Sequence, residues 1–145
     1  MNKFTRVLAA LALAASASTV ALADNVRIVL QGYDPVAYFT DGKPLKGDPQ
    51  HSYDFDEGRY YFASAQHREM FAADPDRYAP QFGGYCTGSM SRNIRAEGDP
   101  NAWVIRDGRL YVFGTTKVFD VMAREPDYFE KRLPSATRNW KAAKS

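Results

Sequence analysis

The chain has 145 residues and a formal charge of +2, from 19 basic and 17 acidic residues. This length suits one domain with its own apolar core, and a single Cys excludes a small fold stapled by internal disulfides. Two of the basic residues, Lys3 and Arg6, lie in the first 23 positions, so the remainder is electrically balanced. That balance argues against a nucleic-acid binder that works by neutralising phosphates.

Residues 1–23 have the layout of a secretory signal peptide. A positively charged start precedes the apolar run 7–15, and Ala21-Leu22-Ala23 is a small-x-small cleavage site. The alternative is an uncleaved membrane anchor, for which the apolar run is short. We therefore expect a mature protein that begins at Asp24, has no permanent membrane span and resides in the periplasm.

The mature chain opens with 26–30, an apolar stretch that predicts a short strand or, alternatively, an extended arm. Residues 53–62 and 103–113 then share a second pattern, with apolar or aromatic residues on both sides of an acid-Gly turn. This pattern is typical of β-hairpins, and we expect Gly58 and Gly108 to supply the positive φ that tight turns require.

A helical pattern follows each hairpin. The first begins at Ser64, a natural N-cap, and ends at Asp74-Pro75, because the residue before proline avoids the helical region. The second begins at Thr115 or Thr116 and ends at Glu125-Pro126. We read 81–100 as a long loop or short helix, and 134–145 as a basic helix with Trp140 against the core.

These elements predict a small single α+β domain over 24–145. It consists of two similar hairpin-plus-helix units, in which antiparallel strands carry helices packed on them, because one such unit cannot bury its own apolar faces. The alternative is that two common motifs look alike by chance. The predicted shared core contains Phe62, Phe71 and Tyr78 from the first unit and Tyr111, Phe113, Val118 and Met122 from the second.

A series of short motifs extends over nearly all of the mature chain. They are Gly32-Tyr33-Asp34-Pro35-Val36, Tyr60-Tyr61-Phe62-Ala63-Ser64, Asp74-Pro75, Gly83-Gly84-Tyr85-Cys86 and Asp99-Pro100-Asn101-Ala102-Trp103. Together they resemble the YHS domain, which occurs in heavy-metal-transporting P-type ATPases, and in particular the exported bacterial YHS-domain proteins. The resemblance implies a YHS-like domain with a C-terminal extension, and it says little about activity.

The chain departs from the metal-linked members of that family at three positions. Where those domains carry Cys, this sequence has Ala37, Ala63 and His67. Methyl groups cannot bind a metal, so only His67 keeps ligand chemistry and the family's thiolate cluster is absent as such.

Two further residues are candidates for a site. Cys86 follows paired glycines, which often shape a site, and it is either a thiolate ligand, a reactive thiol or a small buried hydrophobe. Met90 lies four residues later and would share its helix face. Asp34 either caps a turn or orients an imidazole.

We therefore predict one shallow pocket lined by Asp34, His67, Tyr85 and Cys86. Tyr38 and Met90 are its outer candidates. The predicted metal ligands are Cys86 and His67, with Asp34 and Met90 as weaker candidates.

The sequence leaves three functions open. The first is a non-enzymatic periplasmic binding module for a soft or borderline metal ion such as copper or zinc. The second is a thiol-dependent enzyme or redox-active protein that uses Cys86. The third is a structural or partner-binding domain without metal. No phosphate-binding glycine loop, two-carboxylate glycosidase signature or CxxC pair is present.

Overall fold

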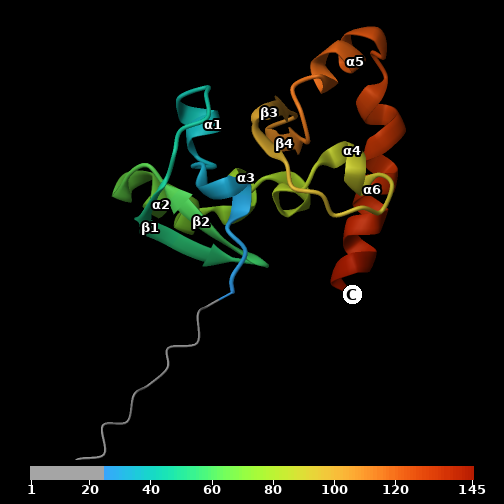
Figure 1. Ribbon diagram of the computed structural model, residues 1–145. Coiled ribbons are helices and arrows are strands. Elements are labelled where there is room, and N and C mark those ends of the chain that lie inside the picture. Colours follow the sequence, from blue (N-terminus) through green and yellow to red (C-terminus); the bar gives the residue numbers. More distant parts are fainter. Residues whose placement is uncertain (1–24) are drawn as a thin grey trace, which may run out of the picture.

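Both predicted hairpin-and-helix units are present in the computed structural model, which describes residues 25–145 (Figure 1). The first unit contains β1 (Asp48–Phe55), β2 (Gly58–Phe62), α2 (Ala65–Ala73) and α3 (Pro75–Tyr78). The second contains β3 (Asp99–Arg106), β4 (Arg109–Phe113), α5 (Val118–Arg124) and α6 (Tyr128–Lys144). The predicted α+β class is confirmed. The predicted signal peptide 1–23 and the start at Asp24 lie outside the described residues.

A short lead-in segment precedes each hairpin, and the two lead-ins are alike. Each consists of a 3-10 turn and a four-residue helix: Val29–Gly32 with α1 (Ala37–Thr40), and Gln81–Gly84 with α4 (Thr87–Met90). Asp34 donates its backbone N–H to the Leu45 carbonyl, and Cys86 donates to the Ala96 carbonyl in the same way. The predicted pair of similar units therefore extends beyond the hairpins and places Asp34 and Cys86 at equivalent positions.

The hairpins also share their register. Each closes across a two-residue turn, with Phe55 opposite Gly58 in one and Arg106 opposite Arg109 in the other. Each first strand begins with Asp-Pro, and each pairing is interrupted by a bulge shortly after that point.

The expected role of Gly58 is wrong, whereas that of Gly108 is met. The left-handed residue of the first turn is Asp56 (φ 54°), while Asp107 and Gly108 (φ 51° and 70°) are both left-handed in the second. Gly58 is required for close packing instead, since a Cβ there would lie 2.3 Å from Cγ2 of Val29. The stretch 26–30 forms no strand: residues 26–28 make an arm with one bridge from Ile28 to Arg59, and Val29 and Leu30 begin the first 3-10 turn.

The apolar side chains form two clusters rather than the single shared core expected from the sequence. All four residues from Leu110 to Phe113 are buried, and they alternate between the clusters. Leu110 and Val112 join the cluster around Phe71, whereas Tyr111 and Phe113 join that around Phe129. Because side chains alternate along a strand, β4 forms the wall between the two units.

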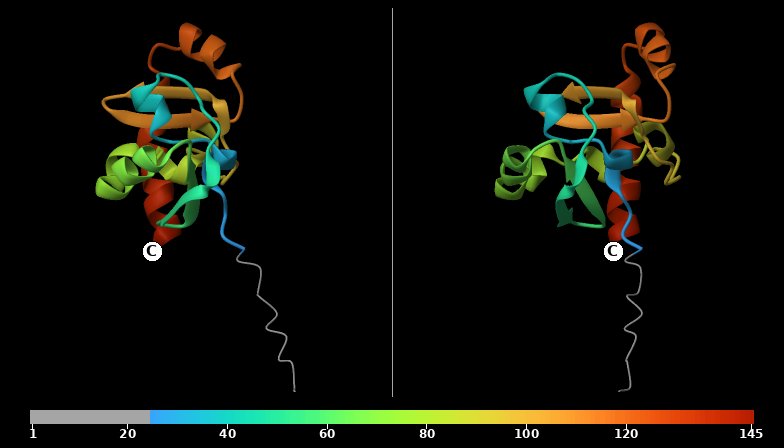
Figure 2. Two further views of the ribbon diagram at one scale, coloured as in Figure 1. Left: turned by 90° about the vertical axis from the view of Figure 1, so that its left-hand side faces the viewer. Right: turned by 60° about the vertical axis from the view of Figure 1, so that its left-hand side comes forward.

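The two units differ in how their first helix packs. In the first, Phe71 of α2 is fully buried against the rings of Tyr60 and Phe62. In the second, α5 lies at the end of the molecule away from the first hairpin (Figures 1 and 2). Met122, expected in the core, is only half-buried, and Phe119 is exposed. This looser packing leaves room for a cavity between α5, α4 and α6.

The last helix starts earlier than expected, at Tyr128, and runs through Pro134. Its Trp140 packs beside the Tyr85 ring and over Gly83, as predicted. Among residues 25–145, no helix has the length and apolar character needed to cross a membrane.

Candidate functional site

Asp34 is fully buried, and its carboxylate is surrounded by hydrogen-bond donors. Oδ1 accepts from the backbone N–H groups of Val36 (2.8 Å) and Ala37 (3.3 Å). Oδ2 accepts from the N–H of Ala63 (2.8 Å) and from Nδ1 of His67 (2.6 Å). Asp34 therefore both caps a turn and orients an imidazole, the two roles considered from the sequence, and it ties the lead-in segment to the strand-helix junction.

His67 reaches Asp34 because α2 begins where the sequence indicates. The Ser64 side chain accepts the N–H of His67 at 3.1 Å and fixes the first turn of the helix. Since a carboxylate can only accept, Nδ1 of His67 donates to Asp34 and Nε2 faces outward. Nε2 lies 3.9 Å from Oδ2 of Asp41, so this place offers two metal-ligating groups, and further ligands would have to come from outside the described residues.

Cys86 lies in a different place, and the predicted single pocket is not formed. The cavity that Cys86 lines includes none of Asp34, His67 and Tyr85. The reason is the repeated architecture: the Gly83-Gly84 loop leads into the second hairpin just as Gln31 and Gly32 lead into the first. Cys86 therefore belongs to the second unit, and it does not fold back onto the first.

The remaining predicted site residues are structural in this arrangement. Met90 is buried (1% exposed) and does not line the cavity. Tyr38 donates its hydroxyl to the Pro100 carbonyl at 2.9 Å, and Tyr85 stacks under the Arg27 guanidinium. Within residues 25–145, no three His, Cys, Asp or Glu side chains gather where they could hold one metal ion.

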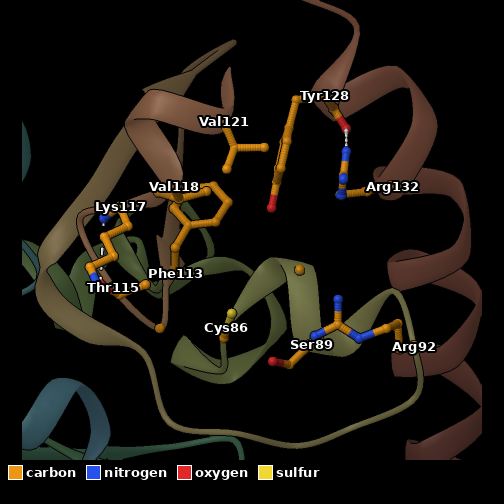
Figure 3. A pocket seen from close by; sticks show the side chains of 12 residues that line it. Cys86, Ser89, Arg92, Phe113, Thr115, Lys117, Val118, Val121, Tyr128 and Arg132 are labelled. Carbon is orange, nitrogen blue, oxygen red and sulfur yellow. Dashed lines mark hydrogen bonds between the residues drawn. The ribbon is translucent and has the colours of Figure 1, made fainter. Parts of the chain in front are cut away.

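The Cys86 cavity has a volume of about 460 Å³, within the usual range for a small-molecule site (Figure 3). Cys86 and Ser89 come from the α4 segment, Phe113 and Val118 from the end of β4 and the start of α5, and Tyr128 from α6. Its surface thus combines apolar and aromatic walls with a few polar groups, which is typical of a site for a small organic ligand.

Positive charge surrounds this cavity. Arg92, Lys117 and Arg132 line it, and no Asp or Glu from the described part of the chain does. Arg132 donates to Glu125 (3.0 Å) and stacks on the Tyr128 ring (3.8 Å from its centre), so its charge is largely compensated. The guanidinium of Arg92 and the ammonium of Lys117 have no hydrogen bond or ion pair with residues 25–145. Both are free to meet an anion.

The hydroxyl of Tyr128 is a polar group at the cavity without a protein partner. Tyr128 is only 5% exposed, and within residues 25–145 nothing hydrogen-bonds to its hydroxyl. Figure 3 shows the ring standing in the cavity with the hydroxyl toward the Cys86 side. Burial raises the pKa of Tyr128, with only partial opposition from Arg132, so at neutral pH the group is a donor. The hydroxyl can therefore donate a hydrogen bond to a ligand in the cavity.

Sequence reasoning identified Cys86 but missed Arg92, Lys117 and Tyr128. These three reach the cavity from separate elements and share no motif, so only the packing of α4, α5 and α6 reveals them. The one usable signal was the repeat itself, which aligns Cys86 with Asp34. Comparisons of the chain with family models, curated proteins and solved structures gave no match.

Proposed function

We propose that this protein is an exported, non-enzymatic binding module that holds a small organic anion in the Cys86 cavity. The observation that carries the proposal is the hydroxyl of Tyr128, which has no protein partner and faces a cavity with unpaired cations at its rim. The layout of 1–23 and the resemblance to exported YHS-domain proteins support the extracytoplasmic location.

The cavity walls suggest the shape of the ligand. Phe113, Val118 and Val121 offer an apolar surface, which favours a hydrocarbon or aromatic body. Tyr128 and Arg92 offer donors, which favour an anionic head such as a carboxylate. A small monocarboxylic acid satisfies both requirements and fits the volume.

Calorimetric titration with phenylacetate and with its neutral amide, phenylacetamide, tests this proposal. We expect the acid to bind and the amide to bind much more weakly, because only the acid engages the cationic rim. Arg92→Gln should weaken acid binding by about tenfold or more, since a hydrogen bond to a charged group contributes roughly 1.5–3 kcal/mol and about 1.4 kcal/mol is a factor of ten. Lys141→Gln, which removes a charge outside this cavity, is the matched control. Equal binding of acid and amide, or no binding of any monocarboxylate in a panel, would reject the proposal.

A metal ion is a second candidate, favoured by the orientation of His67. Asp34 accepts from Nδ1 and so presents Nε2 outward beside Asp41, which is how carboxylates commonly orient a ligating imidazole. Copper or zinc would suit an imidazole and a carboxylate. This metal site would lie in the first unit and would not include Cys86.

Titration of the metal-free protein with copper or zinc separates the two units. Binding that His67→Ala abolishes and Cys86→Ser leaves unchanged would support the His67 site. Binding lost in Cys86→Ser would move the metal to the cavity. Equal affinity of the parent and both variants would leave no specific metal site at either residue.

A further inference from the structure

We infer that Cys86 is a site of oxidation by hydroperoxides, and that its sulfinate takes the place in the second unit that the Asp34 carboxylate holds in the first. The inference concerns a modification of the chain itself. It therefore does not depend on the ligand proposed above, although both use the same cavity.

The first step is the equivalence of Asp34 and Cys86. Each follows a 3-10 turn that contains three residues with positive φ and ends in Gly, the next residue is Tyr in both, and each precedes a four-residue helix. Tyr33 and Tyr85, immediately before them, make matching antiparallel bridges to Lys46 and Glu97. The side chains at 34 and 86 thus leave equivalent backbone positions.

The second step is the fate of the surrounding donors. In the first unit the N–H groups of Val36, Ala37 and Ala63 all bind the Asp34 carboxylate. The equivalent residues of the second unit are Gly88, Ser89 and Gly114. Within the described part of the chain, the N–H groups of these three make no hydrogen bond.

The sulfur of Cys86 lies near these unpaired donors. A Cβ built on Gly114 would be 3.7 Å from Sγ, and one built on Gly88 would be 4.0 Å from Sγ and 2.9 Å from the Tyr128 hydroxyl. Glycine at both positions leaves space around the sulfur that Val36 and Ala63 do not leave around Asp34. The side chain of Tyr128 is 5% exposed and its hydroxyl has no protein partner, so it adds a fourth donor. In the first unit the fourth donor is His67, and the residue equivalent to His67 in the second unit is Val118, which cannot donate.

A sulfinate matches these donors in charge and shape. It carries one negative charge and two oxygens on the atom that follows Cβ, as the carboxylate of Asp does. The thiol presents neither oxygen, which leaves the donors without acceptors. Cys86 is 8% exposed and lines the cavity, so a small hydroperoxide has access to it.

The reaction takes place in two oxygen transfers. The Cys86 thiolate attacks the distal oxygen of the hydroperoxide ROOH, the O–O bond breaks, and a sulfenate and the alcohol ROH (water, for hydrogen peroxide) are formed. A second hydroperoxide oxidises the sulfenate to the sulfinate and is reduced in turn to ROH. Because the chain has a single Cys, no internal disulfide can divert the sulfenate.

Mass spectrometry of the purified protein after hydrogen peroxide treatment tests the chemistry. We expect fragmentation to locate the gain of one and then two oxygen atoms on Cys86, with a dimedone adduct trapping the first product. The Cys86→Ser variant controls for oxidation of Met. Sulfoxidation of Met with Cys86 still a thiol would overturn the inference.

The variant Cys86→Asp tests the placement without any oxidant, against Cys86→Asn and Cys86→Ser. If the donors fit an anion, Cys86→Asp should melt at or above the temperature of the parent and above both neutral variants at neutral pH. Peroxide treatment should likewise raise the melting temperature of the parent but not that of Cys86→Ser. A Cys86→Asp protein that melts below both neutral variants would show an uncompensated buried charge and would overturn the inference.

Discussion

Replacing Asp34 with Ala should destabilise the protein strongly, because this carboxylate joins three segments of the first unit. The substitution leaves the buried N–H group of Val36 and the part-buried N–H group of Ala63 without acceptors, and it frees His67 from its orienting contact. Hydrogen bonds to charged groups contribute roughly 1.5–3 kcal/mol each and are not additive. Removal of one partner of a buried polar pair typically costs about 3–5 kcal/mol, and we expect a loss in that range.

Two variants refine this expectation. Asp34→Asn keeps an oxygen for Val36 but turns an N–H group toward the N–H of Ala63, so we expect a loss of roughly 1–3 kcal/mol from the group left unsatisfied. Asp41→Asn changes a half-exposed carboxylate that is 3.9 Å from His67, and we expect less than about 0.5 kcal/mol.

Urea unfolding followed by circular dichroism measures these free energies. A loss of about 3–5 kcal/mol is a large share of the roughly 5–15 kcal/mol that holds a domain folded, so the midpoint should move clearly. The slope of the unfolding free energy against urea concentration should be the same for parent and variants, since a changed slope reports an altered unfolded state. A loss below about 1 kcal/mol for Asp34→Ala would refute the structural role of this carboxylate.

Three further predictions concern the cores. Phe71→Ala should lower the free energy of unfolding by about 3–5 kcal/mol, because the ring is fully buried. Met122→Ala at the equivalent, half-buried position should lower it clearly less, and equal losses in urea unfolding would contradict the looser packing of α5. Gly58→Ala should cost about 1–3 kcal/mol through the clash with Val29, and a neutral result would mean that the arm 26–30 can shift. Burial raises the pKa of Tyr38 and Tyr60, so the folded state holds these protons more tightly; their stabilisation is complete below the ordinary tyrosine pKa of about 10 and declines as the pH rises above it. Unfolding free energies that stay constant up to about pH 11 would speak against this burial.

Local signals in the sequence carried the prediction of the fold. Ser64 caps α2, and proline at 75 ends it, because these effects depend on neighbouring residues alone. The contact between Asp34 and His67 could also be predicted from the sequence, because the strand-helix junction fixes the position of His67. The predicted role of Gly58 is wrong because the left-handed residue of the turn is Asp56, two positions earlier. The glycine is needed instead for a long-range contact with Val29.

Long-range packing accounts for what the sequence did not reveal. Nothing local distinguishes a loop that returns to the first unit from one that opens a second, so Cys86 was placed beside His67. The cavity itself exists because α5 packs less closely than α2. Its lining residues come from α4, β4, α5, α6 and the loops beside them, which only tertiary contacts bring together.

Amide NMR spectra report directly whether the cavity of the second unit binds a small organic anion. On titration with phenylacetate, we expect the amide chemical shifts of Gly88, Ser89 and Gly114 to change together and to saturate. Those of Ala37 and Ala63, at equivalent positions of the first unit, should stay constant. Saturable movement at Ala37 and Ala63 instead, or no saturable movement at any of the five, would contradict binding in this cavity.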